Sequence, residues 1–473
     1  MLIERKKESE ILRNALVTDE SRFVAIYGRR RIGKTFLVRE VFGYRFTFQH
    51  SGISKGSLKD QLFAFSSSLK DSGYCFKKQP SNWLEAFEGL KEVIRASTEK
   101  KKTIFIDELS WMDTPKSNFI SALENFWNGF ASARKDVLLI VCASATSWMI
   151  SEIIHNKGGL YHRLTDQIHL YPFTLKECET YVESKGLTMN REQILQYYMI
   201  FGGVPFYWSL IKKGFSLAQN IDGILFAKDA PLKDEYDYLY SSIFKKPDVY
   251  LRIVETLGLK KAGMTRDELI ENSGITNSGD LSKKLDELEN CGFIRKYKAF
   301  GNIKKNSIYQ LIDCFTLFYL QFLRNNPNDE HFWTNQLNEP KTNTWLGLAF
   351  ERICFDHINQ IKGKLSIMGV LSDECSWYCK ADADKGIFGC QIDLLIARKD
   401  MVINLCEIKY SGTEYTVTKK TDADLRRKIS DLKTQVEPKY VIFPTLITTY
   451  GLIKNSYSDI FSSVVLLDDL FAF

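Results

Sequence analysis

The sequence contains no apolar run long enough to cross a membrane, and no signal pattern at its beginning. Its longest apolar runs, such as Val137 to Ala143, have the length of a single strand. Met1 leads directly into a charged stretch with helical periodicity. We therefore expect a cytoplasmic protein with no membrane partner.

The sequence also lacks a C-x-x-C pair and the dense cysteine framework of small secreted proteins. Its ten cysteines are scattered among apolar neighbours, which favours a reducing compartment. Cys375, Cys379, Cys390 and Cys406 are close enough in sequence to raise the question of a metal cluster. Several of them lie in strand-like apolar runs, so buried free thiols are the better interpretation.

The overall composition is that of a globular protein with several domains. Hydrophobic residues make up 44% and charged residues 26% of the chain, and the net charge is +6. A length of 473 residues exceeds what one hydrophobic core normally supports. The mild positive charge alone does not identify a partner, because the clustering of the basic residues matters more.

A phosphate-binding loop follows the apolar run Phe23 to Tyr27, which reads as a buried strand. The loop matches G-x-x-x-x-G-K-T and leads into a helical pattern. Its glycines allow backbone N–H groups to approach phosphates, and the helix start favours an anion. The predicted nucleotide-binding residues are Gly28, Arg29, Arg30, Arg31, Ile32, Gly33, Lys34 and Thr35. Lys34 is expected to reach the β- and γ-phosphates and Thr35 to bind Mg²⁺. The three arginines either touch phosphate or face neighbouring domains, and we favour the second.

A second nucleotide motif ends the apolar strand Thr103 to Ile106. Asp107 is expected to hold the Mg²⁺ of the bound nucleoside triphosphate, and Glu108 to polarise the attacking water. Ser144, after the strand at Val137 to Cys142, either senses the γ-phosphate or caps a helix. Strands alternating with helices predict a mostly parallel sheet with ligands at the carboxyl ends of its strands.

The motifs GRRRIGKT, FIDEL, CASATSWM, LYHRLTDQIHLYPF and FGGVP resemble the AAA+ superfamily, and more narrowly the prokaryotic "archaeal ATPase" family. The resemblance implies ATP and Mg²⁺ as cofactors and a helical lid after the sheet. It places Gly203 and Pro205 near the adenine, and Arg163 near the nucleotide of its own or a neighbouring subunit, so a homo-oligomer is possible.

Residues 248 to 311 predict three short helices followed by two strands, which resembles a winged helix-turn-helix. Basic residues lie on the third helix and on the two strands and their connection: Lys283, Lys284, Arg295, Lys296, Lys298, Lys304 and Lys305. They either neutralise DNA phosphates or are solvated around a module that only packs internally. We favour DNA contact.

A second chemical site is predicted beyond residue 326. Two strands joined by a turn near Asp400 bring Asp393 opposite Glu407, and Lys409 shares their face. Two acids can hold Mg²⁺, and the ammonium can orient a water molecule for attack on a phosphodiester. With Glu351 on a preceding helix, the pattern resembles the PD-(D/E)xK nuclease superfamily, and the whole tail resembles the DUF234-type domain attached to archaeal ATPases. The basic run Lys419 to Lys428 either lines a nucleic-acid path or is a solvated helix face.

These patterns predict a multidomain α/β protein. The expected parts are a P-loop parallel-sheet ATPase core (1–174), a helical lid (175–240), a winged helix-turn-helix (241–325) and an α/β PD-(D/E)xK nuclease-like domain (326–473). The predicted function is an ATPase that binds DNA and cleaves it under nucleotide control. The alternative is a nucleotide-switched regulator or scaffold whose last domain only binds nucleic acid or a partner.

Overall fold

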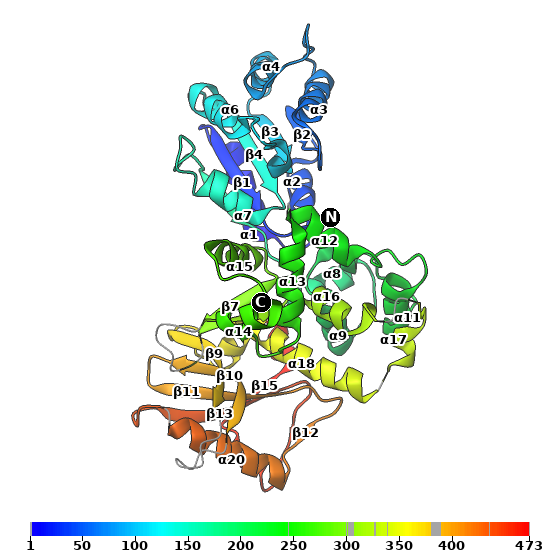
Figure 1. The fold of residues 1–473 in the computed structure, drawn as a ribbon, viewed down its shortest axis with the longest axis vertical. Coiled ribbons are helices and arrows are strands. Elements are labelled where there is room, and N and C mark those ends of the chain that lie inside the picture. Colours follow the sequence, from blue (N-terminus) through cyan, green and yellow to red (C-terminus); the bar gives the residue numbers. More distant parts are fainter. Residues whose placement is uncertain are drawn as a thin grey trace. The chain divides into compact units, whose positions relative to one another are not determined.

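The computed structural model of the chain (Figure 1) describes residues 2–244, 246–298, 300, 307–325, 328–337, 339–379, 389–434 and 436–472. Its contacts divide the chain into two compact units. The first unit consists of Met1–Pro172, Tyr238–Pro247 and Asp286–Cys291, and the second of Phe173–Asp237, Asp248–Leu285 and Gly292–Phe473. No helix among the described residues is both long and apolar enough to cross a bilayer.

The first unit is built on a five-stranded parallel sheet with the order β2-β3-β4-β1-β5. The strands are β1 Arg22–Tyr27, β2 Phe48–Ser51, β3 Lys102–Asp107, β4 Val137–Ala143 and β5 Asp166–His169. Every residue of β3 and β4 is buried, because helices cover both faces of a parallel sheet. The carboxyl ends of β1, β3 and β4 therefore meet at one edge.

Two hydrophobic cores lie on the two faces of this sheet. Phe23 and Ala25 of β1 point into the larger core with α3, α4 and α6, whereas Val24 and Ile26 point into the other with α1 and α2. The helices of this unit are α1 Lys6–Val17, α2 Lys34–Phe42, α3 Leu58–Asp71, α4 Trp83–Ala96, α5 Leu109–Met112, α6 Phe119–Phe126 and α7 Thr146–Trp148, with π-helical turns at Trp127–Ala131 and Met149–Ile154. The predicted mostly parallel sheet with alternating helices is thus present.

The apolar pattern from Tyr44 to Gln49 also predicts a strand, and this prediction is wrong at its beginning. Gly43 and Tyr44 both have positive φ angles, of 58° and 59°. The N–H of Tyr44 donates to Arg39 O at 2.9 Å, which closes the end of α2. Strand pairing therefore starts only at Phe48, beside Ile104.

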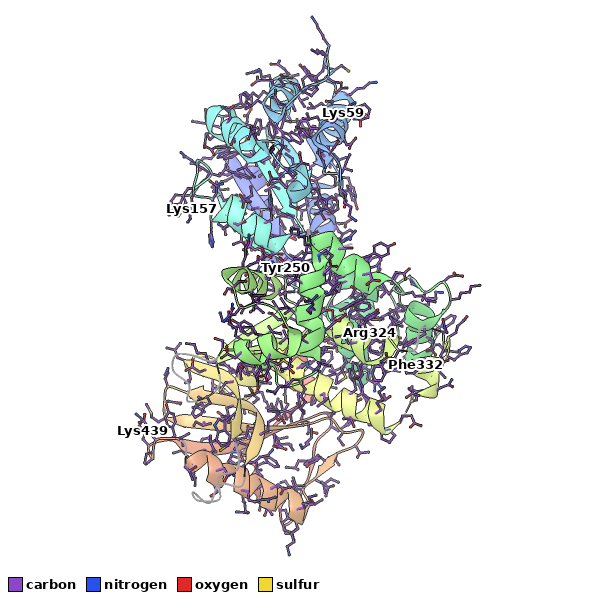
Figure 2. The ribbon with its side chains drawn as sticks, viewed as in Figure 1. Lys59, Lys157, Tyr250, Arg324, Phe332 and Lys439 are labelled. Atoms are coloured by element: carbon purple, nitrogen blue, oxygen red, sulfur yellow. The ribbon has the colours of Figure 1, made fainter. Side chains whose placement is uncertain are left out.

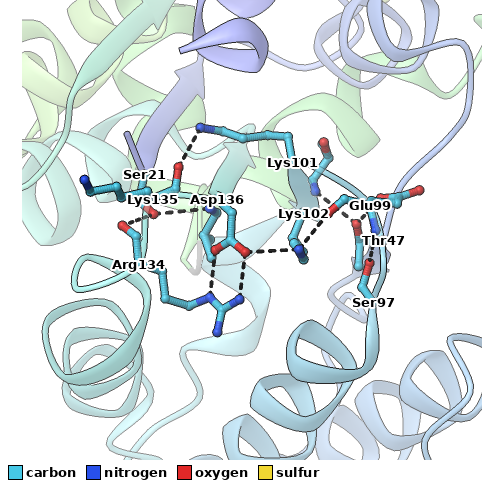
Figure 3. Close-up of polar contacts among 11 residues, drawn as sticks. Ser21, Thr47, Ser97, Glu99, Lys101, Lys102, Arg134, Lys135 and Asp136 are labelled. Atoms are coloured by element: carbon cyan, nitrogen blue, oxygen red, sulfur yellow. Dashed lines mark hydrogen bonds and ion pairs between the residues drawn. The ribbon is translucent and has the colours of Figure 1, made fainter. Parts of the chain in front are cut away.

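Ion pairs and hydrogen bonds to carbonyl oxygens lie at the amino-terminal ends of β3 and β4, opposite the carboxyl ends (Figure 3). Asp136 accepts from Arg134 at 2.7 Å and lies 3.0 Å from the ammonium of Lys102. The hydrogen bonds from Arg134 lower the pKa of Asp136 to about 2. The ammonium of Lys101 donates to the carbonyls of Thr18 and Glu20. These charged side chains therefore pair with one another and with backbone carbonyls where β3 and β4 begin, which is a structural role.

The second unit begins with helices and ends with a mixed sheet. Its helices are α8 Leu175–Ser184, α9 Arg191–Phe201, α10 Pro205–Trp208, α11 Leu217–Ile221, α13 Pro247–Gly258, α14 Arg266–Ser273, α16 Cys314–Phe318, α17 Phe332–Asn335, α18 Pro340–Asp356, α19 Ile358–Lys364 and α20 Lys419–Lys433. Helices α12 Glu235–Ile243 and α15 Gly279–Asn290 begin in this unit and end in residues of the first. Figure 2 marks three side chains that hold the helical part together: Arg324 pairs with Glu255 of α13, Phe332 packs on Phe226, and Tyr250 lies under Lys284.

Residues 247 to 311 form what we call the helix–hairpin module: α13, α14, α15 and a three-stranded antiparallel sheet, β6-β8-β7. The strands are β6 Met264–Thr265, β7 Ile294–Lys298 and β8 Ser307–Leu311. Thr265 caps α14 in a capping box with Glu268, and Gly274 ends it at a φ of 66°. The three predicted helices and the two predicted strands are therefore present, and β6 adds a short third strand. Lys304 and Lys305, predicted to contact DNA, lie outside the described residues.

The C-terminal sheet has the order β15-β13-β11-β10-β9, and it is antiparallel from β9 to β11 and parallel beyond. The strands are β9 Ser372–Cys379, β10 Cys390–Arg398, β11 Val402–Lys409, β13 Val441–Thr448 and β15 Ser463–Leu466, with a short separate pair, β12 Tyr415–Thr416 and β14 Leu452–Ile453. Leu425 and Leu432 of α20 share a core with Leu395 and Leu405 of the β10–β11 hairpin. This places α20 against that face of the hairpin.

Helix α9, in the predicted lid, is fastened to this C-terminal part. Tyr410 accepts a hydrogen bond from Gln196 at 2.9 Å and donates to Glu192 at 3.2 Å, and Tyr450 also donates to Glu192. Arg191 adds an ion pair to Asp468 at 3.0 Å. The predicted lid and the predicted nuclease-like domain therefore belong to one compact unit.

Candidate functional site

The phosphate-binding loop lies between β1 and α2, at the carboxyl edge of the first sheet. Gly28 has a φ of 141°, and a Cβ there would lie 2.2 Å from the carbonyl oxygen of Leu170. Gly33 has a φ of 90° and directly precedes the first turn of α2. Only glycine fits either position without strain, so this sequence builds an open cradle of backbone N–H groups at a helix start.

The ammonium of Lys34 is held inside this cradle. It donates to Gly28 O at 2.8 Å, to Arg29 O at 2.9 Å and to Ser144 Oγ at 3.1 Å, and its side chain is almost fully buried. Burial lowers the pKa of Lys34, while the nearby Glu108 and Asp107 carboxylates oppose the shift. A buried ammonium held mainly by neutral carbonyl and hydroxyl oxygens is suited to accept an anion such as a triphosphate.

The acids of the second motif meet the loop at the same edge. Thr35 Oγ1 donates to Asp107 Oδ2 at 2.6 Å, so hydroxyl and carboxylate sit together as a Mg²⁺ pair requires. Glu108 accepts from Ser144 twice, from Oγ at 2.6 Å and from the backbone N–H at 3.2 Å. Lys34, Ser144 and Glu108 thus form one hydrogen-bonded chain across three strand ends. Ser144 does not cap α7, whose N-cap is Ala145, and its contact with the nucleotide stays a prediction.

The other predicted nucleotide residues have different surroundings. Arg29 is buried, Arg30 and Arg31 are partly exposed, and Ile32 packs into the core with α1 and α2. Arg163 is exposed just before β5. In the second unit, a Cβ on Gly203 would lie 1.8 Å from Phe173 O, and Pro205 opens α10. Gly203 is therefore needed for close backbone packing, and a role of Gly203, Pro205 or Arg163 at the nucleotide stays a prediction.

The second chemical site is on the β10–β11 hairpin. The strand register pairs Leu394 with Cys406, so Asp393 and Glu407 are the next residues on each strand. Lys409 extends from the same face, and its Nζ lies 2.7 Å from Glu407 Oε1. Sequence spacing placed these three side chains together, and the structure has them on one face.

A lysine from α20 completes the surroundings of Glu407. Lys428 Nζ lies 2.7 Å from Glu407 Oε2, so each carboxylate oxygen holds one ammonium. Burial would raise the pKa of Glu407, but Lys409 and Lys428 outweigh it and lower the pKa. Burial by itself would lower the pKa of Lys409, but the Glu407 carboxylate has the larger effect and raises that pKa. Sequence spacing alone gave no sign that Lys428 turns inward, because it stands in a run of basic residues.

Two further carboxyl groups surround this pair. Burial, and then the charge of Glu407, raise the pKa of Asp393. Burial, and then the charge of Asp393, raise the pKa of Glu351 to about 7. Glu351 comes from α18, and Lys261 of the helix–hairpin module lies 3.3 Å from its Oε2. Three acids and three lysines from four chain segments therefore converge here, and no sequence pattern marks Lys261.

The hairpin acids fit Mg²⁺ as a pair. Within the described part of the chain, no three His, Cys, Asp or Glu side chains are grouped so as to hold a metal ion by themselves. Mg²⁺ in phosphoryl-transfer sites usually has one or two carboxylates, with water and phosphate oxygens as the remaining ligands. Asp393 and Glu407 supply that number. The four cysteines at 375, 379, 390 and 406 are free thiols, and the first and last are buried.

Some basic residues of the helix–hairpin module are packed or paired within the protein, and others are exposed. Arg295 lies 3.3 Å from Asp356 and stacks over the ring of Phe355 at 4.4 Å, so it packs inside the second unit. Lys284 pairs with Asp280 on its own helix. Lys296 and Lys298 are exposed. Arg295 is therefore a packing residue, and the prediction of DNA contact rests on the exposed lysines alone.

Comparison with known proteins identifies the first part of the chain. Residues 2–210 match the family described as "ATPase domain predominantly from Archaea". The uncharacterized protein MJECL04 of Methanocaldococcus jannaschii is 24% identical over 435 residues, which are 90% of this chain and 92% of that protein. Among solved structures, a Walker-type ATPase of Pyrococcus abyssi is 13% identical with a TM-score of 0.44 and covers 68% of this chain and 96% of that one. The ORC2 protein of Aeropyrum pernix in ADPNP–ADP complexes is 13% identical with a TM-score of 0.40 and covers 76% and 96%. The family match supports an ATPase domain in the N-terminal part of the chain.

Proposed function

We propose that this protein binds ATP with Mg²⁺, hydrolyses it, and uses the nucleotide to control a metal-dependent DNA-cleaving site in its C-terminal part. The ATPase half of the proposal is supported by the family match and by the chain Lys34–Ser144–Glu108. The nuclease half is carried by one observation, the convergence of Asp393, Glu407 and Lys409 on one face of a hairpin.

At the ATP site, the side chains have separate tasks. Lys34 exchanges its bonds to the loop carbonyls for phosphate oxygens, and the helix start of α2 adds its partial positive charge. Thr35 and Asp107 hold Mg²⁺, which neutralises phosphate charge when it is bound. Glu108 accepts a proton from the attacking water, and Ser144 orients the Glu108 carboxylate and contacts the γ-phosphate.

Replacing Glu108 by glutamine tests the hydrolytic role. We expect Glu108→Gln to retain ATP binding and to lose about 100-fold or more in hydrolysis, because a general base contributes roughly 10²–10⁴-fold. ATP binding is measured with a fluorescent analogue, and hydrolysis by phosphate release. Glu88→Gln, on the exposed face of α4, is the matched control. Unchanged hydrolysis in Glu108→Gln would remove Glu108 from the mechanism.

At the C-terminal site, Asp393 and Glu407 would hold the metal ion, which supplies a polarised phosphate and an activated water. Lys409 orients that water, and Glu351 orders the outer ligands from α18. Exposed Lys296 and Lys298, together with Lys419, Lys420, Arg426 and Arg427 on α20, supply positive charge for a DNA backbone. Cleavage of plasmid and single-stranded DNA with Mg²⁺ or Mn²⁺ tests this half of the proposal.

A second function is favoured by the lysines around Glu407. Both oxygens of Glu407 are already paired, so the C-terminal site is also compatible with a nucleotide-switched regulator or scaffold that does not cut. Slow turnover, nucleotide-dependent oligomer size and metal-independent DNA binding would favour this function. The exposed Arg163 would then act on a neighbour's nucleotide in a homo-oligomer of a cytoplasmic protein.

A further inference from the structure

Lys428 differs from every other basic residue of α20. Arg426 and Arg427 are exposed and pair with Asp422 and Asp424 of their own helix. Lys428 instead turns toward the hairpin and reaches Glu407 at 2.7 Å, with its side chain only 20% exposed. The direction follows from the helix, because Leu425 and Leu432 lie on the same face and anchor it to the hairpin core.

The charges at Glu407 cannot all remain when a divalent cation enters. An ammonium in contact with a carboxylate oxygen repels a divalent cation that binds the same carboxylate, because like charges interact strongly at close range. Lys409 is the more exposed of the two lysines, at 36% against 20%, but the proposed mechanism keeps Lys409 beside the metal ion to orient the water. Lys428 comes from a separate helix and has no such task, so we take it as the group that moves.

We propose that Lys428 is a positioning residue that holds Glu407 in the metal-free protein and turns to a phosphate oxygen of the nucleic acid when the metal ion enters. This inference rests on the proposed nuclease function. Lys428 then has two states, one in contact with a carboxylate and one in contact with a phosphate. Removing its ammonium should therefore strengthen metal binding and weaken substrate binding.

Metal binding with Mn²⁺ alone tests the first state. We expect Lys428→Ala to tighten Mn²⁺ binding roughly tenfold, because a competing charge is removed, whereas Arg426→Ala leaves it unchanged. DNA cleavage by Lys428→Ala should show a raised KM at low metal concentration, and Lys428→Arg should restore KM. A lysine that only supports the fold would weaken metal and substrate binding together.

The outcomes separate this inference from the function on which it rests. Weaker or unchanged Mn²⁺ binding in Lys428→Ala, with binding lost in Asp393→Ala, would overturn the role of Lys428 alone. All of these variants are measured on an Asp107→Ala background, which removes the predicted metal ligand of the ATP site. Mn²⁺ binding that survives Asp393→Ala on that background would overturn both, because the metal site itself would be elsewhere. Thermal unfolding of Lys428→Ala shows whether the variant is folded.

A different observation, the packing of the helix–hairpin module, carries a second inference. The hydroxyl of Tyr297 donates to Ala262 O at 2.6 Å and accepts from Ser376 of β9 at 2.9 Å, and its ring joins the core of the C-terminal sheet. Gln310 links Arg295 to the backbone of Lys261, with distances of 2.6 and 2.7 Å. Strands β7 and β8 are thereby fixed over β9 and α18.

A small cavity lies where the module meets the acidic site. It is lined by Lys261, Tyr297 and Gln310 on one side and by Glu351, Ser376 and Asp393 on the other, and its volume is about 20 Å³. A water molecule needs roughly 10–15 Å³ of such volume, so the cavity holds about one. The cavity itself is therefore too small to hold a phosphodiester group.

The geometry points to the helix–hairpin module as a built-in cover over the Glu351 side of the acidic site, held by the contacts of Tyr297 and Gln310 and by the Lys261–Glu351 ion pair. Reversing the charge of Lys261 should loosen this cover, because two carboxylates would then face each other. Maleimide labelling of Ser376→Cys, followed at the peptide level, should be several-fold faster with Lys261→Glu. Lys260→Glu, whose side chain is exposed, is the matched control.

This test does not depend on nuclease activity. Tyr297→Phe, which keeps the ring in the core and removes both hydroxyl bonds, should also speed labelling if Lys261→Glu proves unstable. Equal labelling rates in all variants would overturn the cover. Faster labelling without DNA cleavage in any variant would support the cover and contradict the nuclease function.

Discussion

Replacing Lys34 by alanine should weaken ATP binding by at least about 100-fold, since it removes two charge-assisted bonds to phosphate, each worth roughly 1.5–3 kcal/mol. The ammonium of Lys34 is buried among Gly28 O, Arg29 O and Ser144 Oγ. Among these contacts, Lys34 is the cation that binds all three oxygens. Equilibrium titration with a fluorescent ATP analogue measures the effect.

Two further variants make the Lys34 result specific. Lys34→Met keeps the length of the side chain and should lose binding equally, because charge and not packing is removed. Arg39→Ala, on the exposed face of the same helix, should bind ATP normally. Unchanged affinity in Lys34→Ala would refute the assignment of the phosphate-binding loop.

Replacing Asp393 by alanine should abolish metal-dependent DNA cleavage, with a loss of at least about 1,000-fold, because a metal ion contributes several kcal/mol to such a transition state. Lys409→Ala should show a comparable loss with metal binding retained. Nicking of plasmid DNA with Mg²⁺ or Mn²⁺, with and without ATP, measures both. Asp400→Ala, in the exposed turn of the same hairpin, is the matched control.

Protein stability provides an independent control for Asp393. Burial and the charge of Glu407 raise the pKa of Asp393 above its unfolded value, so the ionised group destabilises the fold above that pKa. Asp393→Asn should therefore not lower the melting temperature at pH 8, while Mn²⁺ should raise that of the wild type only. Absence of cleavage with every metal, DNA substrate and nucleotide would exclude the nuclease and leave the ATPase intact.

Local sequence patterns predicted most of the elements that carry chemistry. The loop, the acids after β3 and the β10–β11 hairpin depend on short-range rules: glycine at positive φ, alternation along a strand, and a tight turn that fixes register. Asp393 and Glu407 are only fourteen residues apart, and the turn near Asp400 settles their pairing. Such predictions need no knowledge of distant packing.

What the sequence determined by itself is therefore an ATP-binding loop with its acids and a hairpin with a carboxylate pair. The tertiary structure alone decided which lysines meet those acids. Lys428 and Lys261 stand among other basic residues, and their direction depends on how α20 and the helix–hairpin module dock, through contacts between residues far apart in the chain. The same docking turned Arg295 from a predicted DNA contact into a packing residue. Long-range packing is set by burial summed over many side chains, which no local spacing records.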